Sequence, residues 1–85
     1  MQGIPIGARG FDAALAGKRA ECDGGSVDHE GRAAREDFAG TLTGEYLEHG
    51  TPPQRWYLMT DLTLKPPYYD EQSVWCESGF LFVME

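Results

Sequence analysis

The sequence predicts an α+β domain, with N-terminal helices packed on a small antiparallel β-sheet that the C-terminal part mainly forms. Apolar residues recur near helical spacing through the first half of the chain and alternate along the second half. The chain has 85 residues, of which 41% are hydrophobic, a composition typical of a globular protein. We therefore take residues 1–85 as a single domain with a thin core.

The first predicted elements are short. The run IPI at 4–6 predicts a brief strand, and its proline suits a sheet edge because it has no N–H to donate. Residues 11–21 predict a helix, since apolar residues recur near helical spacing from Phe11 onward. The pair Gly24-Gly25 would end that helix.

The longest predicted helix covers residues 28–49. Asp28 can cap its first turn and Gly50 can end it. One face of this helix would carry the apolar residues Phe38, Ala39, Leu42 and Tyr46. Three glycines oppose the prediction, because each costs about 1 kcal/mol in a helix interior: Gly31, Gly40 and Gly44. Continuity of the helix across Gly40–Gly44 is left open.

Two β regions follow. Residues 55–65 alternate between two faces and are rich in β-forming side chains, which predicts a half-buried strand. Residues 73–84 predict a second β region, which Ser78-Gly79 interrupts to leave one bent strand or two short ones. The apolar run FLFVM at 80–84 predicts a central position in the sheet.

Between these regions lies KPPYYDEQ at 65–72, which contains a Pro-Pro-x-Tyr string. Exposed, flexible peptides of this kind dock into aromatic-lined grooves. Here the string stands between two predicted strands, so we interpret it as a hairpin connection that two prolines close. Its tip would present Tyr68, Tyr69, Asp70 and Glu71 to a partner.

Cys22 and Cys76 are too few for a disulfide framework, although one bridge between them is left open. The N-terminus lacks the basic start and apolar block of a secretory signal, so the expected state is two reduced thiols in a bacterial cytoplasm. A zinc site would need Cys22, His29, His49 and Cys76, whose spacing lacks a close ligand pair. We expect no metal, no cofactor and no membrane-spanning segment.

The chain has no recognisable catalytic motif. Ser26, Asp28 and His29 are close in sequence but confined to a predicted turn and helix start. Neither a phosphate-binding glycine loop nor a dinucleotide fingerprint occurs. We therefore expect no catalytic residues, and a binding protein rather than an enzyme.

Charge is distributed unevenly along the chain. Residues 1–35 carry five acids and five bases, whereas residues 36–85 carry nine acids and two bases, so the whole net charge of −7 lies in the second part. This excess argues against direct binding of nucleic acid, whose phosphates need Lys and Arg. It suits a basic protein surface, and the aromatic side chains gathered in the same part suit contact with its cations.

The predicted partner-binding residues belong to two groups. One is an acidic stripe on the 28–49 helix, whose carboxylates could stand in for phosphates, and the other is the tip of the 65–72 loop. The residues are Glu30, Asp37, Glu45, Glu48, Tyr68, Tyr69, Asp70 and Glu71.

The composition also indicates a high-GC genome, because Asn is absent and Ile and Lys are scarce while Ala, Gly and Arg are plentiful. In size, charge and lack of an enzyme motif, the chain resembles the small acidic proteins that phages and mobile elements encode against host defence, anti-CRISPR proteins among them. The resemblance is one of general type and covers no alignable residues. It implies a cytoplasmic inhibitor that binds a basic, nucleic-acid-binding complex and mimics nucleic acid.

A second hypothesis is a small structural, assembly or regulatory subunit that oligomerises through its sheet, for example as a homodimer. An exposed apolar edge at FLFVM would distinguish it from the inhibitor. A metal-binding module or enzyme built on the cysteines and histidines is the third.

Overall fold

A computed structural model of the chain describes residues 8–27, 33–34, 37–63 and 73–84. Their regular structure is antiparallel β-sheet with one short 3₁₀ helix, η1 (Ser78–Phe80), and no α-helix. The strands are β1 (Ala8–Phe11), β2 (Arg19–Cys22), β3 (Ser26–Val27), β4 (Ala33–Ala34), β5 (Phe38–His49), β6 (Gln54–Thr60), β7 (Val74–Glu77) and β8 (Leu81–Val83). The predicted α+β class, with N-terminal helices packed on a C-terminal sheet, is therefore wrong.

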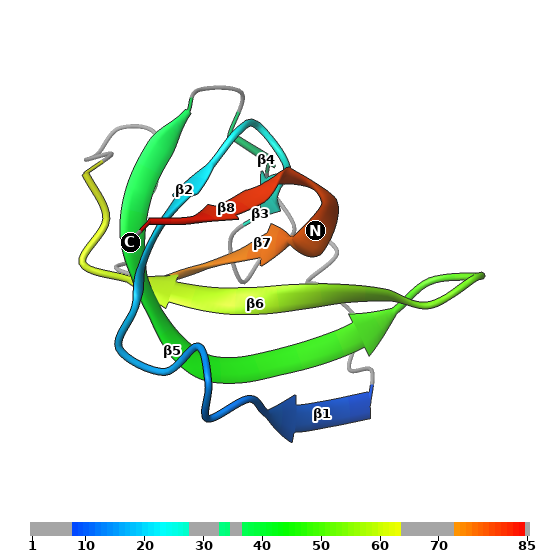
Figure 1. Cartoon of the computed structure of the whole chain (residues 1–85). Coiled ribbons are helices and arrows are strands. Elements are labelled where there is room, and N and C mark those ends of the chain that lie inside the picture. Colours follow the sequence, from blue (N-terminus) through cyan, green and yellow to red (C-terminus); the bar gives the residue numbers. More distant parts are fainter. Residues whose placement is uncertain (1–7, 28–32, 35–36, 64–72, 85) are drawn as a thin grey trace.

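The strands form one curled sheet in the order β4-β3-β7-β6-β5-β2-β8, and β1 pairs separately with β5. Figure 1 shows a half-barrel in which the long, curved β5 runs from one end of the molecule to the other. The curl brings the segment containing β2 and β3 against the segment containing β7 and β8, so that β2 pairs with β8 and β3 pairs with β7. Two further bonds join these segments, from Asp23 N–H to the Phe80 carbonyl at 2.9 Å and from Glu77 N–H to the Gly25 carbonyl at 2.8 Å.

The predicted helix over 28–49 is wrong wherever the structure describes it. Residues 33–34 form β4, and residues 38–49 form the single strand β5. Along β5 the buried positions alternate at first and then change phase: Phe38, Gly40, Leu42, Gly44 and Leu47. A spacing of four or five residues between the large apolar side chains resembles a helical period, which is why the sequence pattern misleads.

The change of phase is a β-bulge. The register of β5 against β6 shifts between Leu42 and Tyr46, and Gly44 has a φ of 93°. A Cβ atom on Gly44 would lie 2.6 Å from the Phe11 ring, so both the backbone conformation and the space favour glycine here. The sequence left open whether a helix continues across Gly40–Gly44; the structure instead has one continuous strand with a bulge there.

The predicted helix over 11–21 is wrong as well. Turns occupy residues 13–17, and β2 begins at Arg19 with exposed and buried side chains in strict alternation. The turn segment is fixed to the bulged strand, since Gly17 N–H donates to the Leu42 carbonyl and Leu42 N–H donates to the Lys18 carbonyl, each at 2.8 Å. The predicted strand at 4–6 lies outside the described residues.

The C-terminal elements agree with the prediction in type. The strand expected at 55–65 is β6, in which Tyr57 and Met59 are buried. Strands β6 and β7 are consecutive, neighbouring and antiparallel, which confirms a hairpin connection between them. The stretch KPPYYDEQ itself lies outside the described residues.

The region 73–84 divides at Ser78-Gly79 into two short strands, the second of the alternatives that the sequence left open. The expected central position of FLFVM is wrong, because β8 stands at the end of the sheet. Its short length and exposed side chains follow from that position.

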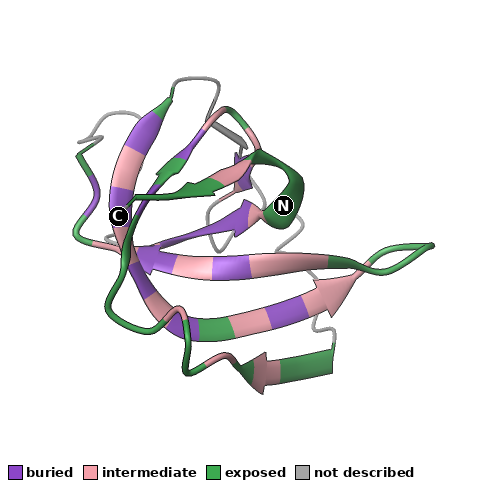
Figure 2. Ribbon diagram, viewed as in Figure 1, coloured by how far each residue is buried: buried purple, intermediate pink, exposed green. Residues whose placement is uncertain are grey.

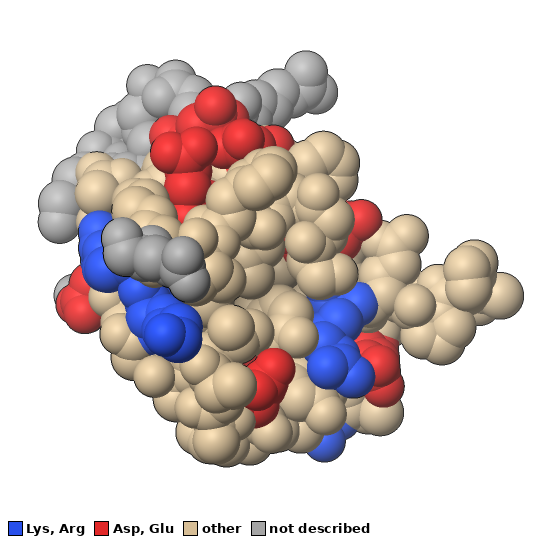
Figure 3. Space-filling view, viewed as in Figure 1, with Lys and Arg blue, Asp and Glu red and all other residues tan. Residues whose placement is uncertain are grey.

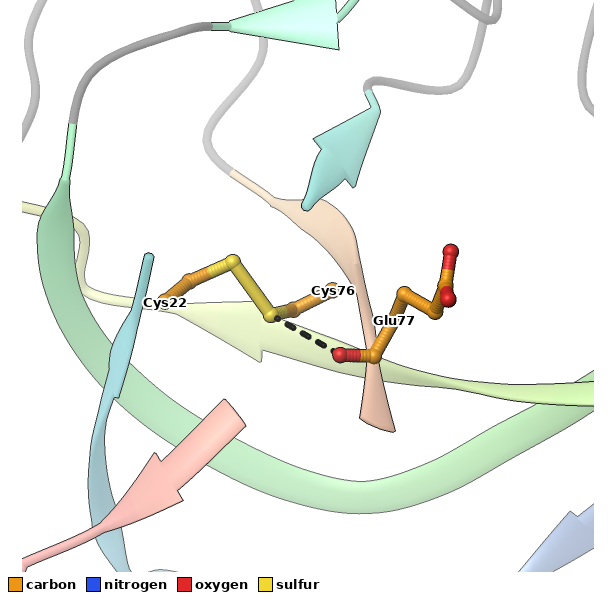
Figure 4. The surroundings of a disulfide bond; sticks show 3 residues. All are labelled: Cys22, Cys76 and Glu77. Atoms are coloured by element: carbon orange, nitrogen blue, oxygen red, sulfur yellow. Dashed lines mark hydrogen bonds between the residues drawn. A yellow bond between two sulfur atoms is a disulfide. The ribbon is translucent and has the colours of Figure 1, made fainter. Parts of the chain in front are cut away.

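A disulfide joins Cys22 in β2 to Cys76 in β7, with a Cα–Cα distance of 6.3 Å. Figure 4 shows the two side chains reaching toward each other from facing strands. The Cys76 sulfur also lies 3.6 Å from the Glu77 carbonyl oxygen, which is a contact only, because a disulfide sulfur has no proton to donate. The expectation of two reduced thiols is therefore wrong for this structure.

The core lies on the concave side of the curl and surrounds this disulfide. Its buried members are Ala20, Cys22, Phe38, Leu42, Tyr57, Met59, Leu62, Val74 and Cys76. Figure 2 shows buried and more exposed residues alternating along β2 and β6, as expected for strands with one face turned to the core. Within the described residues, no helix is long and apolar enough to cross a membrane.

Candidate binding surface

Three of the predicted site residues lie within the described chain, spread along or beside β5. Asp37 precedes the strand and is exposed, Glu45 follows the bulge and is exposed, and Glu48 is half-buried near the far end. Because a strand rises about 3.3 Å per residue, these carboxylates do not form the single stripe expected of a helix. The remaining predicted residues, Glu30, Tyr68, Tyr69, Asp70 and Glu71, lie outside the described residues.

Glu48 belongs to a local cluster rather than to an open acidic surface. Its carboxylate accepts a bond from Arg55 at 3.1 Å, and the Arg55 guanidinium stacks 4.1 Å from the centre of the Tyr46 ring. Hydrogen bonding to the Tyr57 hydroxyl and to Glu48 raises the pKa of Arg55. Arg55 thus already occupies the Glu48 carboxylate.

This cluster borders an open hollow of about 570 Å³ between β6 and η1. The lining residues are Glu48, Pro53, Gln54, Arg55, Tyr57, Glu77, Ser78 and Gly79. With its nitrogen assigned as the donor, the Gln54 amide lies 3.1 Å from Glu77 Oε2. The polar groups of the hollow are thus largely paired with one another, and the hollow is wide and shallow.

A different surface forms on the convex side of β2 and β8. Ala20 and Cys22 turn inward and are fully buried, so Arg19 and Glu21 between them turn outward. Glu21 lies directly opposite Phe82 of β8. Charged side chains of one strand therefore stand beside apolar side chains of the next.

Three carboxylates gather at one end of this surface. The register pairs Cys22 with Phe38, and continuing it by one residue places Asp23 opposite Asp37 on the side of β5. Figure 3 shows acidic side chains gathered at the end of the molecule where β2 ends and β5 begins. The pKa of Glu21 is raised, chiefly by a hydrogen bond to Asp23 and then by the negative charge of Asp23 and of Asp37. The carboxylates therefore repel one another in the free protein.

The neighbouring apolar row comes from the C-terminal segment. Phe80 is 44% exposed, Phe82 is 56% exposed and Met84 is 42% exposed. A side chain on Gly25 would collide with the Phe80 ring, so this phenylalanine packs directly against the Gly25 backbone. We call the six residues of this surface the acidic–aromatic face: Glu21, Asp23, Asp37, Phe80, Phe82 and Met84.

Arg19 limits the face at its other end. Its guanidinium donates to Thr41 Oγ1 and to the Asp61 carbonyl, both at 3.0 Å. These two bonds hold the guanidinium toward β5 and the end of β6. The carboxylates at the opposite end are left without this cation.

Sequence reasoning found Asp37 and missed the rest of the face. The signal for β2 was present in RAEC, where charged and apolar residues alternate, but it is only four residues long. Glu21 and Asp23 lie in the part of the chain whose net charge is zero, and a count along the chain cannot show that they meet Asp37. The exposure of Phe80 and Phe82 depends on β8 being at the end of the sheet.

The disulfide also bears on the metal-site hypothesis. A cysteine binds zinc as a thiolate, and both thiolates are consumed in the Cys22–Cys76 bond. Among the residues that the structure describes, no group of His, Cys, Asp and Glu side chains has a metal-binding arrangement. His29 lies outside those residues.

Searches with the chain match no protein-family model, no curated protein and no solved structure.

Proposed function

We propose that this chain is a binding protein that attaches to a basic protein surface through its acidic–aromatic face. The observation that carries the proposal is the convergence of Glu21, Asp23 and Asp37 beside the exposed Phe80 and Phe82. Carboxylates that repel one another in the free protein would be relieved by a cation from a partner. Exposed aromatic rings beside them can stack on guanidinium groups.

The target class that fits this chemistry is a nucleic-acid-binding protein complex, because such proteins expose dense Lys and Arg. Binding there would cover the surface that nucleic acid uses, and the protein would act as an inhibitor. The resemblance in type to phage-encoded inhibitors of bacterial defence supports this choice of target. A net charge of −7 would speed association with a basic surface.

The proposal places the protein in the cytoplasm of a bacterial host, where disulfides are rare. The Cys22–Cys76 bond weighs against that compartment. An inhibitor acting there must keep its face when the bond is reduced.

The test is an affinity capture from a high-GC bacterial lysate at low and high salt. Wild-type protein is compared with Asp37→Asn, which neutralises the face, and with Glu45→Gln, which neutralises an exposed acid elsewhere on β5. We expect a nucleic-acid-binding complex that the wild type and the Glu45 variant retain, and that the Asp37 variant and high salt release. Equal retention by all three proteins would mean that the acids only confer solubility.

The second candidate is an assembly subunit that oligomerises through β8. The observation that favours it is the exposed apolar residues at the end of the sheet, the discriminating feature expected for this class: Phe80, Phe82, Val83 and Met84. Sedimentation over a range of concentrations tests it. A dimer that Phe82→Ala dissociates would favour assembly over the inhibitor.

A further inference from the structure

The outer edge of β8 offers backbone hydrogen-bonding groups as well as side chains. Strand β8 pairs with β2 on one side, and no strand in the described part of the chain pairs with its other side. Among the described residues, Asp23 N–H donates to the Phe80 carbonyl and Met84 N–H donates to the Arg19 carbonyl. These two bonds fix which backbone groups of β8 face β2.

In an antiparallel ladder, bonded pairs alternate with non-bonded pairs. Positions 80, 82 and 84 are therefore bonded to β2, and the backbone groups of Leu81 and Val83 point away from it. The Leu81 N–H is already used, since it donates to the carbonyl of Ser78, the first residue of η1. The free edge thus presents the Leu81 carbonyl, the Val83 N–H and the Val83 carbonyl.

The charges around this edge select its occupant. A second copy of the chain would bring another net charge of −7 and another set of acids to the edge. A cationic segment would instead bring a counter-charge to Glu21, Asp23 and Asp37, which form no ion pair with a Lys or Arg among the described residues. Complementary charge therefore favours a basic partner strand over a second copy.

The geometry also specifies the pattern of that segment. A strand added to β8 would lie about 10 Å from β2, with Phe82 between them. An arginine on its convex face could cross Phe82 and reach Glu21, because the two long side chains together span about that distance. Residues on its other face would meet the partly exposed Leu81 and Val83 and should be apolar.

We propose that β8 binds an extended partner segment as an added antiparallel strand, with Arg or Lys at alternate positions and apolar residues between them. This inference rests on the proposed function, since it names how the basic partner is held. The partner's backbone would bond to Leu81 and Val83, and its cations would lie over Phe82 against the acids. Strand addition of this kind gives affinity through the main chain and specificity through alternate side chains.

A blocked peptide of alternating arginine and valine is the probe. The peptide residue opposite Val83 exchanges both hydrogen bonds with it and points its side chain to the same face, so that residue is a valine. Methylating the backbone nitrogens of the valines removes the N–H donors that face β8. Methylating the backbone nitrogens of the arginines instead gives a control peptide of equal charge and composition, in which the blocked N–H donors face away from β8.

Binding is followed by NMR titration of the intact, oxidised protein. We expect the valine-methylated peptide to bind about tenfold more weakly than the other two, because it forfeits one or two backbone bonds. We also expect the Val83 amide to become protected from exchange when the unmethylated peptide binds.

Equal binding of both methylated peptides would overturn strand addition. If binding of the peptides is still weakened by salt and by Asp37→Asn, the proposed function is retained without strand addition. Failure of all three peptides to bind would count against the proposed function itself. A Val83 amide that is already protected in the free protein, increasingly so with concentration, would assign the edge to a second copy.

Discussion

Cys22 and Cys76 are bonded to each other although β5 and β6 lie between their strands in the order of the sheet. In a flat sheet, three strand spacings would separate their Cα atoms by about 14 Å. The observed separation is 6.3 Å, so the sheet must curl until β2 faces β7. The disulfide therefore closes the half-barrel and fixes the strand that carries Glu21.

We first predict that reducing this bond lowers the free energy of unfolding by about 4 kcal/mol, the chain-entropy value for a loop of 54 residues. Urea unfolding of the oxidised and reduced wild type measures the difference. The double variant Cys22→Ala/Cys76→Ala should be unaffected by the reductant. A reduced protein that is as stable as the oxidised one would show that strand pairing alone sets the curl.

Gly44 tests the bulge in β5. Alanine at this position must adopt a positive φ and meet the Phe11 ring, so Gly44→Ala should destabilise the protein by about 2 kcal/mol. Gly79→Ala is the matched control, because the nearest atom to a Cβ there, Glu77 Oε1, lies 3.8 Å away. The urea unfolding midpoints of both variants measure the two losses of stability. Similar losses at the two positions would contradict the bulge geometry.

Glu21 makes stability depend on pH. Its pKa in the folded state is raised above the ordinary 4.5, so the folded protein binds this proton more tightly than the unfolded chain does. The stabilisation from that proton is complete below pH 4.5 and is lost as pH rises through the folded pKa. Glu21→Gln is always neutral, and its stability relative to wild type should therefore increase from acid to neutral pH.

Urea unfolding of both proteins across that pH range, at constant ionic strength, measures this change. Glu45→Gln should show no comparable trend. A Glu21 variant whose difference from wild type is constant with pH would mean that the three carboxylates do not interact. The same substitution should affect partner binding in the opposite direction. Glu21→Gln is expected to be more stable than wild type at neutral pH but to bind a basic partner more weakly, because it has lost a negative charge of the face.

Substitution of Phe82 distinguishes a contribution to stability from a contribution to partner binding. Because its side chain is 56% exposed, Phe82→Ala should cost less than about 1 kcal/mol of stability. The buried Phe38, at 4% exposure, is the contrast, and Phe38→Ala should cost about 3–5 kcal/mol. Binding of the arginine–valine peptide, measured by titration calorimetry, should nevertheless weaken in Phe82→Ala. Unchanged peptide binding would remove Phe82 from the face.

The sequence predicted elements well where alternation runs uninterrupted and poorly where a bulge breaks it. Strand β6 alternates from Trp56 to Thr60 and was predicted as a strand, with its start one residue late at 55 and its end five residues late at 65. In β5 the bulge at Gly44 shifts the buried side by one residue, and the result imitates a helical period. The glycines that argued against a helix were the more reliable signal, because helix propensity does not depend on the phase of the pattern.

The acidic–aromatic face could be predicted only in part, for reasons of topology. Asp37 was identified from charge, but Glu21 and Asp23 meet it only because β2 lies between β5 and β8. Residues far apart in the chain also form the disulfide, and no local pattern reports that β2 and β7 face each other. Local sequence patterns indicate turns and strands, whereas the meeting of side chains that are distant in the sequence depends on the order of the strands in the sheet.

The proposed inhibition of nucleic-acid binding is tested by a displacement measurement with the complex captured from the bacterial host. A fluorescent nucleic acid is bound to that complex, and its release by wild-type protein is compared with release by Asp37→Asn and by Glu45→Gln. We expect wild type and Glu45→Gln to displace the nucleic acid equally, and Asp37→Asn to do so about tenfold less effectively because it loses one charge-assisted contact. Equal displacement by Asp37→Asn and wild type, or none by wild type, would contradict this expectation.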